Sequence, residues 1–144
     1  MKSSIVLLCL SLICSSAAHA EDLKVRVFEG TTTTTDGKAE KVTLMVVTQP
    51  GAKAPAVGPT SASLTFNADG MAPITVAFNS VQLDWESGPI HAVQTASVDS
   101  GGMLQEVQLS LNCGSLPERN ELANFSCLYV STLSPNPIQI SFKQ

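Results

Sequence analysis

The stretch that decides the fold is residues 23–47, LKVRVFEGTTTTTDGKAEKVTLMVV. Apolar and polar side chains alternate on both sides of Asp36-Gly37, which is the pattern of two β-strands that each present one face to a core. Asp-Gly is a strong signal for a two-residue hairpin turn, because both positions tolerate positive φ. The turn predicts that Thr35 lies opposite Lys38, and a complete register follows from that pair.

In this register, one face of the hairpin gathers its aliphatic side chains. The predicted pairs are Thr31 with Val42, Glu29 with Leu44, and Val27 with Val46. The predicted core face consists of Val25, Val27, Val42, Leu44 and Val46. Five threonines, Thr31–Thr35, then lie at the hairpin tip and are interpreted as an exposed strand end. An O-glycosylated segment and a hydroxyl array for a flat ligand are the alternative interpretations.

The same alternation recurs along the rest of the chain. The further runs are 64–66, 74–78, 81–85, 91–98, 107–113, 125–133 and 138–142. Turn signals separate them at Asp69-Gly70, Gly88-Pro89, Gly101-Gly102 and Pro135–Pro137. These features predict an all-β fold, an antiparallel immunoglobulin-like β-sandwich of about eight strands with one disulfide. A small antiparallel β-barrel is the alternative. The proline-rich loop Gln49–Thr60 is expected to cross from one sheet to the other.

The first twenty residues have the pattern of a cleaved secretory signal peptide. Lys2 precedes the apolar run Ile5–Cys14, and Ala18–Ala20 matches the small-x-small cleavage pattern. The apolar run is shorter than the roughly 20 residues that a membrane-spanning helix needs. We therefore expect residues 1–20 to be removed and residues 21–144 to form a single β-sandwich domain, periplasmic or secreted.

The charge pattern excludes one class of partner. The chain has 8 Lys and Arg against 12 Asp and Glu, a net charge of −4, and the charges are scattered. A nucleic-acid surface calls for clustered basic residues, so no nucleic-acid partner is expected. No other segment is apolar for long enough to cross a membrane, so no transmembrane segment is expected after signal cleavage.

Cys113 and Cys127 are the two cysteines that remain after signal cleavage. Redox motifs hold their cysteines closer together, and a metal site needs more ligands than one histidine and two cysteines supply. An even pair in an exported chain predicts a disulfide. If the two cysteines face each other, Leu111 opposes Tyr129 and Val107 opposes Leu133.

The loop between the cysteines has a helix-start signal. Ser115 and Glu118 fit a capping box, which predicts one or two helical turns over Pro117–Leu122. Leu122 and Leu116 would then fold onto the edge of the sandwich. The charged residues of this turn, Glu118, Arg119 and Glu121, are the candidate partner contacts.

A second candidate site lies at Asp84-Trp85-Glu86. On a strand, both carboxylates share a face about 7 Å apart, a separation that could flank a glycosidic bond or hold a cation together with His91. The simpler interpretation is a polar outer face opposite a core tryptophan, Trp85. A catalytic triad would have to use His91, and no nucleophile motif accompanies it. No catalytic residue, metal site or cofactor is therefore predicted.

These observations rank function by class. The first hypothesis is an exported, non-enzymatic β-sandwich module that binds protein or forms part of the cell envelope or surface, with an envelope or surface protein as partner. The second is a small carbohydrate-active or cation-dependent enzyme that uses Asp84 and Glu86.

Overall fold

The computed structural model describes residues 23–51, 56–118 and 123–143, which form an all-β antiparallel structure. The strands among these residues are β1 (Lys24–Thr33), β2 (Ala39–Pro50), β3 (Val57–Asn67), β4 (Ile74–Phe78), β5 (Ser80–Gln82), β6 (Pro89–Ser100), β7 (Met103–Ser115), β8 (Phe125–Ser131) and β9 (Ser134–Lys143). The predicted all-β antiparallel class is confirmed. Each predicted alternating run contributes to one of these strands.

All of these strands belong to one hydrogen-bonded sheet, in the order β4-β3-β2-β1-β9-β8-β7-β6-β5. Neighbours along the chain are neighbours in the sheet, except that β4 and β5 form its two ends and β1 pairs with β9. This order differs from the Greek-key connections of an immunoglobulin-like domain. The expected topology is therefore corrected to an antiparallel meander, which arises because consecutive strands are joined as hairpins.

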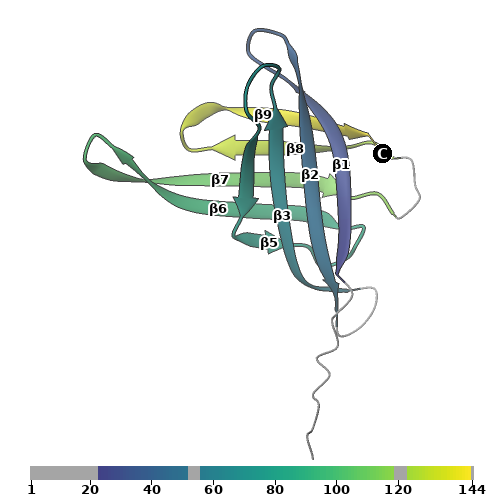
Figure 1. Ribbon diagram of the computed structural model, residues 1–144. Coiled ribbons are helices and arrows are strands. Elements are labelled where there is room, and N and C mark those ends of the chain that lie inside the picture. The colour runs from purple at the N-terminus through teal and green to yellow at the C-terminus, as the bar shows by residue number, and fades with distance from the viewer. Residues whose placement is uncertain (1–22, 52–55, 119–122, 144) are drawn as a thin grey trace, which may run out of the picture.

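The sheet folds over itself so that its two halves cross. In Figure 1, β1–β3 run steeply while β6–β9 run across them. The halves join at β1 and β9, which share only four residue pairs, from Glu29↔Lys143 to Thr32↔Ile140. The end strands also approach the opposite half, with β5 contacting β3 and β4 contacting β6. The result is a nearly closed, barrel-like sheet.

The apolar core lies between the two halves and receives side chains from both. Its largest fully buried members are Phe28, Phe142, Leu44, Leu64, Ile90, Leu111, Leu116, Ile140, Val42 and Val46. Phe125 of β8 meets the edge of Phe28 at 5.0 Å and stacks on Phe142 at 4.9 Å between ring centroids. Gly30 pairs with Phe142, and a Cβ at Gly30 would lie 2.6 Å from that ring, so only glycine fits there.

The register of the first hairpin differs by one residue from the prediction. Phe28 lies opposite Leu44, and Val27 lies opposite Met45. The loop holds three residues because Thr34 pairs with Lys38 through a 2.8 Å hydrogen bond and Gly37 takes a φ of 82°. A slip of one residue turns every side chain of a strand to the other face.

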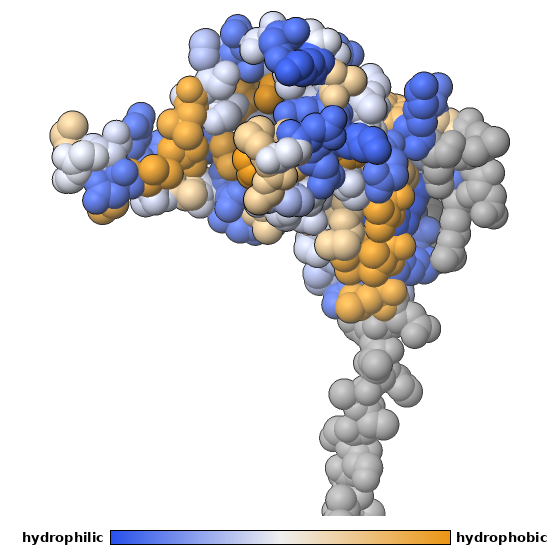
Figure 2. Space-filling model, turned by 45° about the horizontal axis from the view of Figure 1, so that its top comes forward, coloured by the Kyte–Doolittle hydropathy of each residue, from blue (hydrophilic) through white to orange (hydrophobic). Residues whose placement is uncertain are grey.

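The predicted core positions on β1 are therefore wrong, whereas those on β2 are confirmed. Val25 and Val27 are 57% and 55% exposed, and Phe28 is buried in their place. The physical reason is the three-residue turn together with the larger apolar area of Phe28, which reaches the aromatic cluster. Thr32 also faces inward, where its hydroxyl donates to the carbonyl of Gln139 at 2.8 Å. Leu23, Val25, Val27 and Met45 are left as an exposed apolar band on the outer face of β1 and β2 (Figure 2).

Two connections also differ from the predictions. The proline-rich segment after Gln49 does not cross between sheets, because β2 and β3 pair directly from Lys41↔Asn67 to Pro50↔Val57. Residues 52–55 of that segment lie outside the described residues. Pro135–Pro137 belong to β9, and the turn before them is at Thr132–Leu133. Proline cannot donate a backbone hydrogen bond, but it is tolerated near the start of a strand, and Pro135 and Pro137 lie near the start of β9.

Candidate functional site

The disulfide between Cys113 and Cys127 joins β7 to β8 at one end of the molecule. The two residues lie opposite each other with a Cα–Cα distance of 4.0 Å, and Leu111 lies opposite Tyr129 as predicted. The predicted contact between Val107 and Leu133 is not formed. The chain turns after Ser131, where β8 ends, and Leu133 is 62% exposed.

The chain after the disulfide is tied to the turn that precedes β6. The Leu116 amide donates to the carbonyl of Gly88 at 3.0 Å, and Leu116 is buried as predicted. Ser115 ends β7 and residues 116–118 are not helical, so the predicted capped helix does not begin there. Glu118 is exposed. The other candidate contacts, Arg119 and Glu121, lie outside the described residues, as does most of the expected helical turn.

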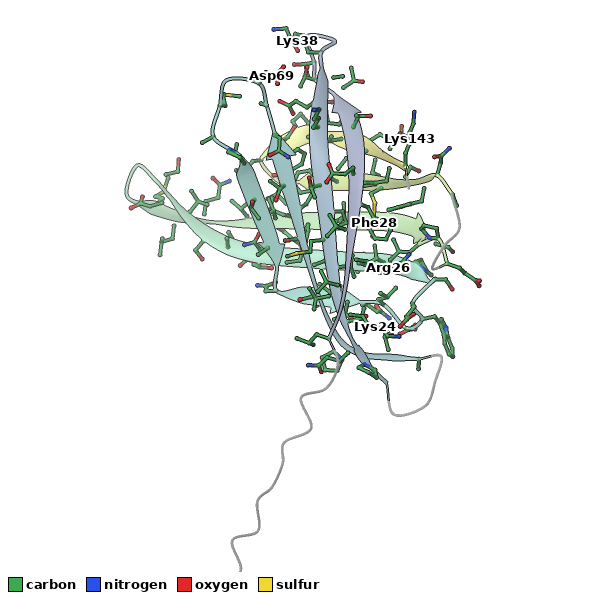
Figure 3. All side chains as sticks on the ribbon, turned by 45° about the vertical axis from the view of Figure 1, so that its right-hand side comes forward. Lys24, Arg26, Phe28, Lys38, Asp69 and Lys143 are labelled. Atoms are coloured by element: carbon green, nitrogen blue, oxygen red, sulfur yellow. A yellow bond between two sulfur atoms is a disulfide. The ribbon has the colours of Figure 1, made fainter. Side chains whose placement is uncertain are left out.

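Arg26 connects this segment to the loop around Trp85. Its guanidinium donates to the carbonyl of Glu86 at 2.8 Å and to the carbonyl of Pro117, and it lies 4.9 Å above the ring of Phe28. Lys24, one step along the same face, forms an ion pair with the carboxylate of Glu86. Figure 3 shows Lys24, Arg26 and Phe28 in series along β1. On the inner face of β1, Phe28 therefore belongs to the core, whereas Arg26 and Lys24 bond to the loop around Glu86, and Arg26 also bonds to the segment at Pro117.

Trp85 is not the core anchor that the alternation predicted. The strand ends at Gln82, Leu83 is the last buried residue before Trp85, and Trp85 is 49% exposed. Its backbone forms an isolated bridge with Ala56, and its carbonyl accepts from the Gly88 amide at 2.9 Å. The turn over 85–88 breaks the period-two pattern, so the two faces of the predicted strand do not exist here.

A cavity of about 480 Å³ opens beside Trp85 and the disulfide. It is lined by Gln82, Asp84, Trp85, Pro89, Ile90, His91, Asn112 and Cys113. His91 of β6 and Asn112 of β7 are paired across the strands, and the His91 Nδ1–H donates to the Asn112 side-chain oxygen. Ile90 and Cys113 are almost fully buried and form the apolar floor.

The structure separates the two carboxylates of the enzyme hypothesis. Asp84 and His91 line the cavity, whereas Glu86 does not and is paired with Lys24. Among the described residues, no group of three or more His, Cys, Asp or Glu side chains is placed to hold a metal ion. The arrangement can bind a ligand with polar groups, and it offers one carboxylate rather than a pair.

A second cavity, of about 600 Å³, follows the threonine run. Thr31–Thr35 and Glu40 form one side, and β9 residues from Ser134 to Ser141 form the other. The run is not simply a hairpin tip, because Thr31–Thr33 are part of β1 and Thr32 is buried. Alternate hydroxyls face opposite sides of the strand, so the groove presents only part of the array.

The end of the β6–β7 hairpin projects from the body of the molecule (Figures 1 and 2). Every residue from Ser97 to Glu106 is exposed, and we call this segment the β6–β7 arm. β5 pairs with β6 only at residues 91–93, and β8 pairs with β7 only at residues 109–113. Among the described residues, the strands of the arm therefore pair only with each other.

Sequence reasoning missed the cavity and the arm, although the sequence held signals for the His91–Asn112 pair and for the turn after Trp85. Gly101-Gly102 as a two-residue turn sets Ser100 opposite Met103 and, by counting back, His91 opposite Asn112. Ser87-Gly88-Pro89 directly after Trp85 is a turn signal that argues against a continuous strand. The projection of the arm depends on how short β5 and β8 are, and no local pattern indicates that.

No family model matches the chain, and neither the curated proteins nor the solved structures include one significantly similar to it. Among the described residues, no helix has the length and apolarity needed to cross a membrane.

Proposed function

We propose that this protein is an exported, non-enzymatic β module that binds a partner protein through the β6–β7 arm. The observation that supports this proposal is the arm itself: Ser97–Ser100 and Met103–Glu106 form a two-stranded ribbon with both outer edges unpaired among the described residues. An isolated hairpin is only marginally stable in water. Free edges also offer backbone groups to an added strand from another chain.

The side chains of the arm favour a protein partner. Val98 and Met103 lie on the same face of the hairpin as the buried Val107. This face therefore carries exposed apolar side chains beyond the point where the core ends. Met103 and Leu104 are 75% and 80% exposed. The arm has no proline and no lysine, the residues by which many edge strands avoid pairing. Its only charges, Asp99 and Glu106, lie on the other face.

The remaining parts of the proposal concern compartment and surface. A disulfide is typical of an oxidising compartment, which supports a periplasmic or secreted protein whose signal peptide, residues 1–20, has been removed. The partner would be an envelope or surface protein. The loop containing Glu118, Arg119 and Glu121 would serve as a second contact. At the described start of this loop, Arg26 donates to the carbonyl of Pro117. The two-carboxylate enzyme is less favoured, because Glu86 is already paired with Lys24.

For the fold, we infer that a two-layer sandwich describes the sheet better than a closed barrel. Two features support this. β1 and β9 share only four pairs at the fold-over. The end strands β4 and β5 contact the opposite half without pairing to each other.

Site-specific photo-crosslinking in cells tests the proposed arm. A photoreactive phenylalanine analogue placed at Met103 or Leu104 is expected to give a discrete adduct with one partner. Met71 is the matched control, because it is a methionine of similar exposure (65%) at a different turn. The double substitution Val98→Lys and Met103→Lys should abolish the adduct formed from Leu104 without changing the unfolding transition. Equal labelling from Met71 and the arm, or no adduct from the arm, would contradict the proposal.

A further inference from the structure

The cavity beside Trp85 combines an apolar floor with a polar rim. Ile90 and Cys113 are 1% and 7% exposed at its base, and Asp84, His91 and Asn112 line it above them. Its volume of about 480 Å³ lies within the range of small-molecule sites. It is separate from the β6–β7 arm, because none of its lining residues lies within Ser97–Glu106.

Trp85 is held in place although its side chain is half in water. Leaving about half of Trp85 exposed forgoes part of the hydrophobic stabilisation that burying the indole would give. The backbone around it is nevertheless fixed, because the Asp84 carbonyl accepts from the Val57 amide at 3.1 Å and the Trp85 carbonyl accepts from Gly88. A Cβ at Gly88 would lie 3.2 Å from the Trp85 carbonyl oxygen, so the turn is compact. The ring is thus presented on a preorganised loop, which lowers the ordering cost of binding.

The polar groups of the rim have hydrogen-bonding capacity to spare. Within the described parts of the chain, the Asp84 carboxylate and the Gln82 amide make no side-chain hydrogen bond or ion pair. The Asn112 oxygen accepts from His91, which leaves the Asn112 amide nitrogen as a donor and directs it away from that bond. The lining therefore offers both donors and acceptors, and it contains no lysine or arginine.

We propose that this cavity is a binding site for a neutral saccharide, one sugar ring of which stacks on Trp85. A pyranose has an apolar C–H face that packs on an aromatic ring and a rim of hydroxyls that both donate and accept. Asp84 and Gln82 would accept from, and Asn112 would donate to, those hydroxyls. An anionic ligand is disfavoured because Asp84 contributes a carboxylate to the lining and no lysine or arginine is there to balance it. A proline-rich peptide is disfavoured because such peptides dock on grooves with several aromatic residues. Among the residues that line this cavity, Trp85 is the only Phe, Tyr or Trp.

The test uses the tryptophan as its own reporter, because Trp85 is the only tryptophan in the chain. The protein is titrated with maltotetraose, cellotetraose and chitotetraose and, separately, with a proline-rich decapeptide, while Trp85 emission is followed. At least one oligosaccharide should give a saturable change with a Kd of about 1 mM or below, which corresponds to about −4 kcal/mol. The peptide should give none.

Variants then locate the binding. Asp84→Asn and Asn112→Ala should each weaken it at least tenfold, with Glu29→Gln on the outer face of β1 as the control that leaves it unchanged. Asn112→Ala also removes the hydrogen-bond partner of His91. Gln82→Ala is therefore included, because Gln82 is exposed and does not bond to His91. Trp85→Phe, followed by calorimetry, should retain weaker binding than the parent. Saturation by the peptide alone, no saturation by any oligosaccharide, or an unchanged Kd in the three rim variants and in Trp85→Phe would each overturn the proposal.

Discussion

Phe28 lies directly opposite Leu44 in the antiparallel pairing of β1 with β2, and both side chains are buried. This pair sets which face of β1 enters the core. It also places Arg26 and Lys24, two and four residues earlier, on the inward face, where they reach the loops at the end of the sheet.

Substitutions at Phe28 and Val27 distinguish the observed register from the predicted one, which differs by one residue. Phe28→Ala should lower the free energy of unfolding by about 3–5 kcal/mol, because it removes a buried ring that packs against Phe125 in the aromatic cluster. Val27→Ala should change it by about 0.5 kcal/mol or less, because Val27 is 55% exposed. Urea unfolding followed by circular dichroism measures both. The reverse order of the two effects would indicate the register in which Val27 faces the core.

The disulfide should account for a substantial share of stability. It closes a loop with a sequence separation of 14, so replacing both cysteines with alanine should cost about 3 kcal/mol by loss of chain-entropy constraint. The denaturant midpoint measures this loss. In protein begun at Glu21, thiol labelling under denaturing, non-reducing conditions should modify neither Cys113 nor Cys127. Two labelled thiols would contradict the pairing.

Arg26 should matter more than Lys24, although both are basic residues on the same face of β1. Arg26→Lys keeps the charge but loses the fork that bonds the carbonyls of Glu86 and Pro117, so we expect a loss of about 1–2 kcal/mol. Lys24→Gln removes a half-exposed ion pair and should cost about 1 kcal/mol or less.

Hydrogen exchange supplies the local measurement for the same comparison. The amides of Gly88 and Leu116, which bond at the two loops, should exchange faster in Arg26→Lys than in Lys24→Gln. Equal exchange rates in the two variants would show that Arg26 does not hold the loops together.

Tyr129 should make stability depend on alkaline pH. Burial raises the pKa of Tyr129 above its ordinary value of 10.0. The folded state therefore resists ionisation more than the unfolded state does. The associated stabilisation is complete below about pH 10 and is lost as the pH rises through the folded pKa. Tyr129 is the only tyrosine, so its ultraviolet absorbance gives the titration midpoint directly. Tyr129→Phe should lose less stability between pH 9 and 11 than the parent, and identical losses would count against this assignment.

Trp85 emission checks the second correction to the sequence prediction. With 49% of the residue exposed, native protein should emit near the wavelength of free tryptophan and should be quenched readily by acrylamide. Unfolding should then shift the emission only slightly. Blue-shifted native emission that resists quenching would restore the core-anchor interpretation.

Local sequence patterns predicted much of the fold. The strands around residues 107–113 and 138–142 follow from period-two alternation, because an antiparallel strand with one buried face repeats every two residues. The disulfide followed from the even pair of cysteines in a chain expected to be exported, and the apolar faces of the two runs supported it, with Cys113 and Cys127 at matching positions. These features depend on residues near one another in sequence, or on a single facing pair.

The candidate site was less predictable. Trp85 sits in an apolar alternation that continues for only three residues of actual strand, and the turn that ends it is stabilised by a bridge to Ala56, far away in sequence. The cavity needs that turn, the disulfide and the His91–Asn112 pair at once. The residues of this cavity come from separate segments of the chain, so they form no motif with a fixed spacing that could be recognised in the sequence.

By itself, the sequence determined an all-β antiparallel chain, the approximate positions of its strands and most of its turns, and one disulfide, because alternation, turn residues and cysteine count act locally. Only the tertiary structure decided the register of the first hairpin, since both one-residue alternatives place apolar side chains on a face. The packing of Phe28 against Phe125 accompanies the register that formed. Tertiary structure also decided which strands extend past their neighbours, and so it placed the β6–β7 arm and the half-exposed Trp85 where a partner or ligand can reach them.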